Sequence, residues 1–278
     1  ALAGDDRDPE TLARLRELYH LNDPIWMQYL QWVKNALQGD LGRSIRTGLP
    51  VSDMIAQKLP VTIQLAVMSM IFAAAIGIPA GIISAVKKGT ITDYAANVIA
   101  LSGLSIPNFW LGIMLILLVS VKWRLLPASG YVPLSEDPVQ SIRTMLMPAF
   151  VLGTALAASL MRHTRSAMLG VLRQDYVRTA RAKGVSHNSV LFKHAFRNAV
   201  NPLVTLFGYS LASLLSGSLL VEIVMNWPGL GRLVFEAISA KDEPLVLASV
   251  LISTLLLVFG NLVADLLLAL VDPRVRLS

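Results

Sequence analysis

VTIQLAVMSMIFAAAIGIPAGIISAV, residues 61–86, contains no Lys, Arg, Asp or Glu. A helix needs about 20 apolar residues to cross a hydrocarbon core about 30 Å thick, so this run is long enough to span a membrane. Four further runs share its composition, the last of them with one carboxylate: 98–121, 145–161, 199–221 and 246–271. Their length and their Ala, Gly, Leu and Ile content exclude barrel strands, and a helix satisfies its own backbone in lipid. We therefore predict an all-α integral membrane protein, a bundle of five transmembrane helices.

Charged residues are scarce and unevenly placed. They make up 15% of the 278 residues, against about 25% in soluble domains. Segments 87–93, 162–198 and 272–278 hold half of the 24 Lys and Arg residues but only three of the 18 Asp and Glu residues. Because basic loops stay in the cytoplasm, these segments are expected there. This orientation makes 1–59 an extracytoplasmic N-terminal segment and 60–278 a transmembrane domain.

The N-terminal segment contains one pattern of its own, DPETLARLRELYHL at 8–21. Leucines recur at helical spacing after an Asp-Pro start, so we predict an external amphipathic helix. Such a helix could pack on the spans, lie on lipid or dock an extracytoplasmic partner.

Small residues and prolines mark the spans as closely packed and bent. Ala73, Gly77 and Gly81 repeat every four residues, a stripe that lets another helix approach closely. Pro107 lies inside the run 98–121 and predicts a kink there.

Several polar side chains lie inside the runs and could line a wet pathway. The candidates are Ser102, Ser105, Asn108 and Asn201. Alternatively, each could hydrogen-bond to a neighbouring helix. Asp265 is the carboxylate of the last run; it suggests a function, or it could pair with a basic residue or with Asn261.

The longest cytoplasmic segment, 162–198, has a basic stretch broken by a glycine. We expect a helix to continue the third span as far as Gly184 and a second helix to follow it, which makes a protruding elbow. The basic residues could hold anionic lipid. Nucleic-acid binding is disfavoured because no nucleic-acid motif is present. In the third alternative the elbow fits a groove in a cytoplasmic partner, where small residues permit close approach.

The elbow also carries a family resemblance. RTARAKG at 178–184 resembles the "EAA…G" signature of membrane subunits of bacterial ATP-binding-cassette importers, in the variant found in dipeptide, oligopeptide, nickel and glutathione permeases. Four further stretches fit the same subfamily: GDLGRSI at 39–45, GLSIPNFWLG at 103–112, NWPGLGR at 226–232 and DPRVR at 272–276. The resemblance covers essentially the whole chain, which is similar to the first (B-type) of the two permease subunits. Family members usually have six spans. Either the first one is missing from this chain or the chain is a natural short form, and we expect the former.

The resemblance implies a role for the elbow. It would be the coupling helix that inserts into one of two separate ATP-binding subunits. The residues expected there are Arg178, Thr179, Ala180, Arg181, Ala182, Lys183 and Gly184. The sequence has no G-x-x-x-x-G-K-[S/T] phosphate loop. ATP and Mg²⁺ are therefore expected on those partner subunits, and the chain itself is expected to be neither an enzyme nor a cofactor or metal carrier.

The resemblance also implies a place and further partners. The chain would lie in the bacterial cytoplasmic (inner) membrane, among lipid, beside a second homologous permease. An extracytoplasmic solute-binding protein would deliver the solute. Candidate contacts with that protein are Asn226, Trp227, Pro228, Gly229 and Arg232.

The substrate and the transport class have alternatives. Di- and oligopeptides are expected, while a nickel chelate or glutathione stays open. A self-energised secondary transporter would normally show inverted repeats or several intramembrane charges, and neither is evident here. An intramembrane serine hydrolase would need a histidine at membrane depth, but all four histidines lie outside the runs.

Overall fold

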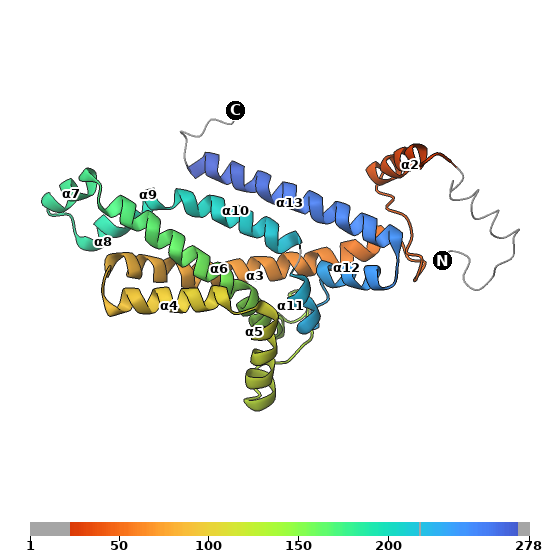
Figure 1. Ribbon diagram of the computed structural model, residues 1–278, viewed down its shortest axis with the longest axis horizontal. Helices are drawn as coiled ribbons and strands as arrows, with labels where there is room; N and C mark the ends of the chain where they lie inside the picture. Colours follow the sequence, from red (N-terminus) through yellow and green to blue (C-terminus); the bar gives the residue numbers. More distant parts are fainter. Residues whose placement is uncertain (1–22, 217, 272–278) are drawn as a thin grey trace, which may run out of the picture.

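The computed structural model describes residues 23–216 and 218–271, which form an elongated assembly of helices (Figure 1). The helices are α2 (Ile25–Leu37), α3 (Val51–Val86), α4 (Ile91–Ser105), α5 (Asn108–Leu115), the π-helix η1 (Ile116–Lys122), α6 (Pro138–Leu172), α7 (Asp175–Ala182), α8 (His187–Ser189), the π-helix η2 (Val190–Phe196), α9 (Arg197–Ala199), α10 (Asn201–Ser216), α11 (Leu219–Val224), α12 (Leu230–Ser239) and α13 (Glu243–Val271). The described residues contain no strand, only an isolated bridge between Arg43 and Pro50. The helix predicted at 8–21 and the DPRVR stretch lie outside the described residues.

The predicted apolar runs form the long helices, which confirms the membrane-helix class. In the described part of the chain, α3, α6 and α13 are each long and apolar enough to cross a membrane, and α4 with α5 and η1 would make a fourth, bent span. The run 199–221 corresponds to α10, which has 16 residues, followed by the short α11. α3 and α6 extend well beyond their predicted runs. At the start of α6, the Gln140 N–H donates to Asp137 Oδ1 at 3.0 Å, and Pro138 occupies the first turn.

The bend at Pro107 is sharper than a kink. Ile106 has extended backbone, with φ −79° and ψ 123°, because a residue that precedes proline is excluded from helical conformation. The helix stops there, and the two halves meet at 99°. As a result α5 and η1 leave the bundle almost perpendicular to α4 (Figure 1).

The closest helix packing joins α3 to α6, along the predicted small-residue stripe. A Cβ on Gly77 would lie 2.5 Å from the carbonyl oxygen of Ala157, and one on Gly81 would lie 2.6 Å from that of Met161. From the other side, a Cβ on Gly153 would lie 2.9 Å from the Ser69 carbonyl oxygen. The predicted role of the stripe is confirmed, because only glycine permits this separation.

The two ends of the bundle differ in construction. At one end, α7, α8 and α9 form the elbow between α6 and α10, and towards the other lie α12 and α2, while α11 lies beside α5 (Figure 1). Trp227, only 1% exposed, centres a core among α3, α6 and α11 towards the second end, and its ring meets Tyr131 edge-on at 5.2 Å.

Candidate functional site

The elbow begins with a break that the sequence did not predict. Instead of one helix up to Gly184, α6 ends at Leu172 and α7 starts after Gln174, whose backbone is extended with φ −71° and ψ 148°. The prediction of a continuous helix was therefore wrong at this point. The break turns α7 back, so that Val177 and Ala180 pack against Val190. Val190 belongs to the second arm of the elbow, which α8, η2 and α9 form. The elbow thus has a small core of its own.

Gly184 ends α7 as predicted, and the reason is conformational. Its φ is +77°, in the left-handed region that L side chains rarely adopt, while a Cβ at this position would meet nothing within 4 Å. The Gly184 N–H donates to the Arg181 carbonyl at 3.0 Å and the Val185 N–H to that of Ala180 at 3.2 Å. These two bonds form a Schellman motif, with Val185 closing onto the elbow core.

The seven residues predicted for the elbow share one stretch but not one environment. Ala180 is buried in the elbow core and supports α7 from inside, so no surface of this side chain is left for a partner. The other six are exposed: Arg178, Thr179, Arg181, Ala182, Lys183 and Gly184. Among them only Arg178 has an ion pair within the described residues, with Asp175 at 3.7 Å, and that pair is solvent-exposed. The elbow therefore presents an exposed tip, rich in small and cationic residues.

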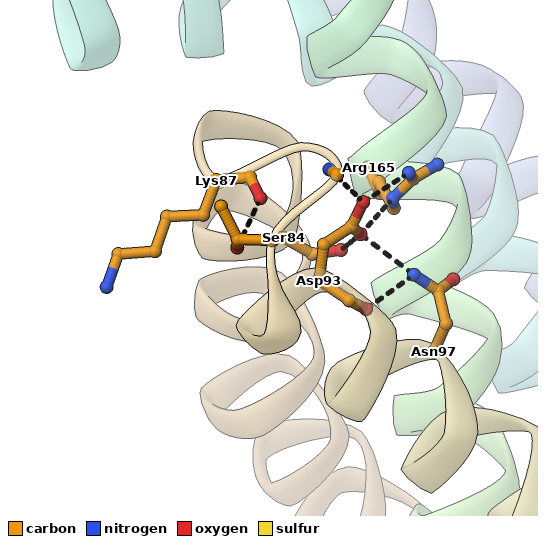
Figure 2. Close-up of polar contacts among 7 residues, drawn as sticks. Ser84, Lys87, Asp93, Asn97 and Arg165 are labelled. Carbon is orange, nitrogen blue, oxygen red and sulfur yellow. Dashed lines mark hydrogen bonds and ion pairs between the residues drawn. The ribbon is translucent and has the colours of Figure 1, made fainter.

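An ion pair between buried Asp93 and half-buried Arg165 joins α4 to α6, on the α6 segment that leads into the elbow (Figure 2). Arg165 of α6 donates from Nε to Oδ1 and from Nη2 to Oδ2 of Asp93, both at 2.8 Å. Asp93 also accepts from Ser84 Oγ at 2.5 Å and from the Gly89 N–H at 3.0 Å, and Asn97 Nδ2 donates to it at 2.9 Å. A bidentate, charge-assisted pair fixes orientation as well as distance.

This network joins three helices at the elbow end of the bundle. Ser84 belongs to α3, Asp93 and Asn97 to α4, and Arg165 to α6, seven residues before α6 ends. Sequence analysis did not single out Asp93 or Arg165, because the partners are 72 positions apart. The available signal was the single carboxylate in the short basic segment 87–93.

At the opposite end, the NWPGLGR stretch wraps around a carboxylate that sequence analysis also missed. Glu222 is fully buried in α11 and accepts from Ser218 Oγ and from the Arg232 N–H, both at 2.9 Å. A Cβ on Gly229 would lie 2.6 Å from the carboxyl group, so glycine is required for this approach. Burial raises the pKa of Glu222, opposed by the hydrogen bonds from Arg232 and Ser218. The carboxylate lies at the N-terminus of α12, where backbone N–H groups favour an anion.

The five candidate binding-protein contacts divide between core and surface. Trp227 and Gly229 are buried inside the chain, and the Trp227 indole N–H donates to the Val61 carbonyl at 3.4 Å. They have no free surface for a partner, which corrects their predicted role to one of packing. Asn226 is exposed, while Pro228 and Arg232 are half-buried.

The GDLGRSI stretch is anchored beside this region. Ser44 Oγ donates to Asp242 Oδ2 at 2.5 Å, and the Ile45 N–H donates to Oδ1 at 3.1 Å. Asp242 is buried at the turn between α12 and α13. The motif thus ties the chain before α3 to the start of the last span.

The candidate pathway residues are not all brought together. Ser102 and Ser105 are exposed on α4, and their hydroxyls donate to the carbonyls of Val98 and Leu101, at 3.0 and 2.9 Å. Asn108 follows directly across the bend, half-buried at the start of α5, whereas Asn201 begins α10 beside the elbow. Three of the four therefore cluster at the bend.

Comparison with known proteins identifies the family to which this chain belongs. Residues 77–277 match the family model described as "Binding-protein-dependent transport system inner membrane component". The chain is 47% identical to the oligopeptide transport system permease protein AppB of Bacillus subtilis, over 94% of this chain and 83% of that protein. It is 42% identical to the dipeptide transport system permease protein DppB of Escherichia coli K12, over 96% of this chain and 86% of that protein.

Solved structures share the fold. A chain from a structure of the MetNI methionine ABC transporter in inward-facing conformations superposes with a TM-score of 0.65 at 18% identity, covering 79% of this chain and 96% of that one. An amino acid ABC transporter crystallised with histidines gives a TM-score of 0.58 at 14% identity, covering 81% and 95%.

Proposed function

Because the chain belongs to the family of binding-protein-dependent transport system inner membrane components, we propose that it is the first of two permease subunits of an importer for di- and oligopeptides. The observation that carries the substrate class is the identity of 42–47%, over nearly the whole chain, to permeases named for dipeptides and oligopeptides. The protein is an ABC-type permease of the inner membrane. Its other subunits and its solute are parts of the proposal.

The elbow is proposed as the contact with an ATP-binding subunit. Its exposed tip offers Ala182 and Gly184 for close approach and Arg178, Arg181 and Lys183 for acidic groups on the partner. ATP and Mg²⁺ are held and ATP is hydrolysed on those subunits, while this chain contributes no reacting group. Movement of the tip is passed to α6 and, through the second arm, to α10.

The ion pair carries this movement further. Arg165 holds α4 to α6 close to the elbow through two charge-assisted hydrogen bonds to Asp93. α4 ends at the bend where Ser102, Ser105 and Asn108 cluster. In this proposal a displacement of α6 therefore reaches the candidate pathway residues without an intervening flexible segment.

The end of the bundle opposite the elbow is proposed to receive the solute from the binding protein. Asn226, Pro228 and Arg232 form the surface proposed to meet a solute-binding protein, held in shape by the Glu222 carboxylate behind them. A peptide released there enters a pathway shared with the second permease.

Ala182→Trp tests the coupling role. Ala182 is exposed and ends α7 in ordinary helical conformation, so a bulky side chain blocks docking without straining the turn. The matched control is Lys88→Trp, exposed in the loop between α3 and α4 but outside the elbow. Each variant is co-expressed with the second permease, the ATPase subunits and the binding protein, and ATP-driven uptake of a radiolabelled tripeptide is measured in proteoliposomes.

We expect Ala182→Trp to abolish uptake and Lys88→Trp to retain it, at equal abundance of the permease. Wild-type uptake by Ala182→Trp would refute the coupling role. If the unsubstituted complex instead carries a nickel chelate or glutathione and no peptide, the substrate class is wrong while the importer class stands.

A further inference from the structure

The last span, α13, is poorly covered by the rest of the chain. Only 17% of its most apolar window is buried. Its covered face packs on α10, where Gly208 approaches Ala264 so closely that a Cβ would lie 1.8 Å from the alanine Cβ. The rest of α13 runs along one long side of the molecule (Figure 1). Lipid, water or another protein must cover it.

Two stripes of different chemistry share this uncovered surface. Thr254, Val258, Asn261 and Asp265 follow the spacing i, i+4, i+7 and i+11, which places them on one line along a helix. Leu255, Phe259, Leu262 and Leu266 repeat the same spacing one residue further on. All eight side chains are exposed in this chain, and those of the second stripe are 47–61% exposed. The first, polar stripe holds three polar residues and the second, apolar stripe none.

The apolar stripe suits lipid, but the polar stripe does not. Thr254 is satisfied internally, since its hydroxyl donates to the Val250 carbonyl at 2.8 Å. The side chains of Asn261 and Asp265 make no hydrogen bond or ion pair with any residue in 23–216 or 218–271. A carboxylate in a membrane helix normally faces protein or water, because the charge is costly in hydrocarbon. Asp265 also lies six residues from the end of α13, on the side where anionic lipid would repel it.

We propose that the polar stripe is the surface by which this chain meets a membrane helix of the second permease, which presents a hydrogen-bond donor or a cation to Asn261 and Asp265. The inference rests on the proposed function, which supplies that subunit. The shape of the stripe favours a helix over an aqueous pathway. It is one residue wide, contains Val258, and is flanked by exposed Leu257 on one side and by the apolar stripe on the other. Such a narrow line is how one membrane helix contacts another.

Photo-crosslinking at adjacent positions tests the assignment in the complete importer. Benzoylphenylalanine replaces Val258, in the polar stripe, or Phe259, in the apolar stripe; both side chains are exposed to a similar extent, 57% and 61%. We expect irradiation to join the second permease to position 258 and to leave position 259 without a protein adduct. Equal adducts at both positions, or none at 258, would overturn the inference.

A second measurement identifies an aqueous pathway. The chain has no cysteine, so Val258→Cys introduces the only thiol of the subunit. We expect this thiol to resist a charged methanethiosulfonate reagent in the assembled importer. Rapid modification would assign the stripe to the pathway and overturn the proposal.

Co-purification distinguishes a failure of this inference from a failure of the proposed function on which it rests. We expect Asp265→Leu to lower the amount of second permease recovered with the tagged chain by up to about tenfold, and Leu266→Ala to leave it unchanged. Undiminished recovery with Asp265→Leu counts against the stripe. If the unsubstituted chain recovers no second permease, the proposed function itself fails, and this inference falls with it.

Discussion

Gly77→Ala tests whether the contact between α3 and α6 is set by the small-residue stripe. The added Cβ would lie 2.5 Å from the Ala157 carbonyl oxygen and 2.9 Å from the Leu160 Cβ, where ordinary contacts begin at 3.4 Å. The first contact is to backbone and cannot rotate away, so α3 must move by about 0.9 Å. A gap of this size forfeits a quarter to a half of the dispersion energy of each separated atom pair.

We expect Gly77→Ala to lower the free energy of unfolding by about 3 kcal/mol, the upper end of the range for overpacking. The matched control is Gly170→Ala, on α6, where a Cβ meets nothing within 4 Å. That control should gain about 0.5–1 kcal/mol from helix propensity. Unfolding of the purified chain by SDS in mixed micelles, followed by circular dichroism, measures both.

The double variant sharpens the test. Gly81→Ala collides with the same helix, 2.6 Å from the Met161 carbonyl oxygen, and one outward shift of α3 relieves both collisions. The two substitutions together should therefore cost less than the sum of their separate costs. A cost below about 1 kcal/mol for Gly77→Ala, or strict additivity of the pair, would refute the argument.

Three further predictions concern the ion pair and the two ends of the bundle. Asp93→Ala should lower the melting temperature of the purified chain more than Arg165→Ala does, because the carboxylate keeps three other donors when the guanidinium is lost; an equal loss would contradict this. Gly184→Val should destabilise the elbow turn by about 1–2 kcal/mol and expose it to limited proteolysis, whereas Gly184→Asn, which tolerates a positive φ, should protect it nearly as well as glycine. Gly229→Ala should displace the Glu222 carboxylate, so a double-mutant cycle with Glu222→Ala should show a total cost below the sum of the separate ones, and simple additivity would count against the contact.

The features predicted correctly from sequence are those with a local signal. Uncharged runs long enough to span a bilayer identified the long helices, and the glycine at 184 identified the end of α7. The stripe at Ala73, Gly77 and Gly81 also showed itself by spacing alone. Each depends on residues close together in the chain.

The missed features depend on distant partners. The break at Gln174 accompanies the packing of Val177 and Ala180 on Val190, a contact with the other side of the elbow that the helical pattern around Gln174 does not reveal. Pro107 predicted a bend, but its size of 99° depends on how α4 and α5 pack on other helices. The polar residues around Arg165 and Glu222 come together only in the folded chain. The coupling and pathway roles of the predicted site residues remain predictions.

The small core of the elbow determines how a force applied there is distributed. Val177 and Ala180 on the first arm and Val190 on the second are packed together, and Val171 and Leu172 at the end of α6 join them. Because these residues share one core, a displacement of α7 is not confined to the loop that joins α7 to α6. In the proposed coupling role, a displacement of the tip would therefore act on α6 and α10 together, as in a lever with a single input and two outputs.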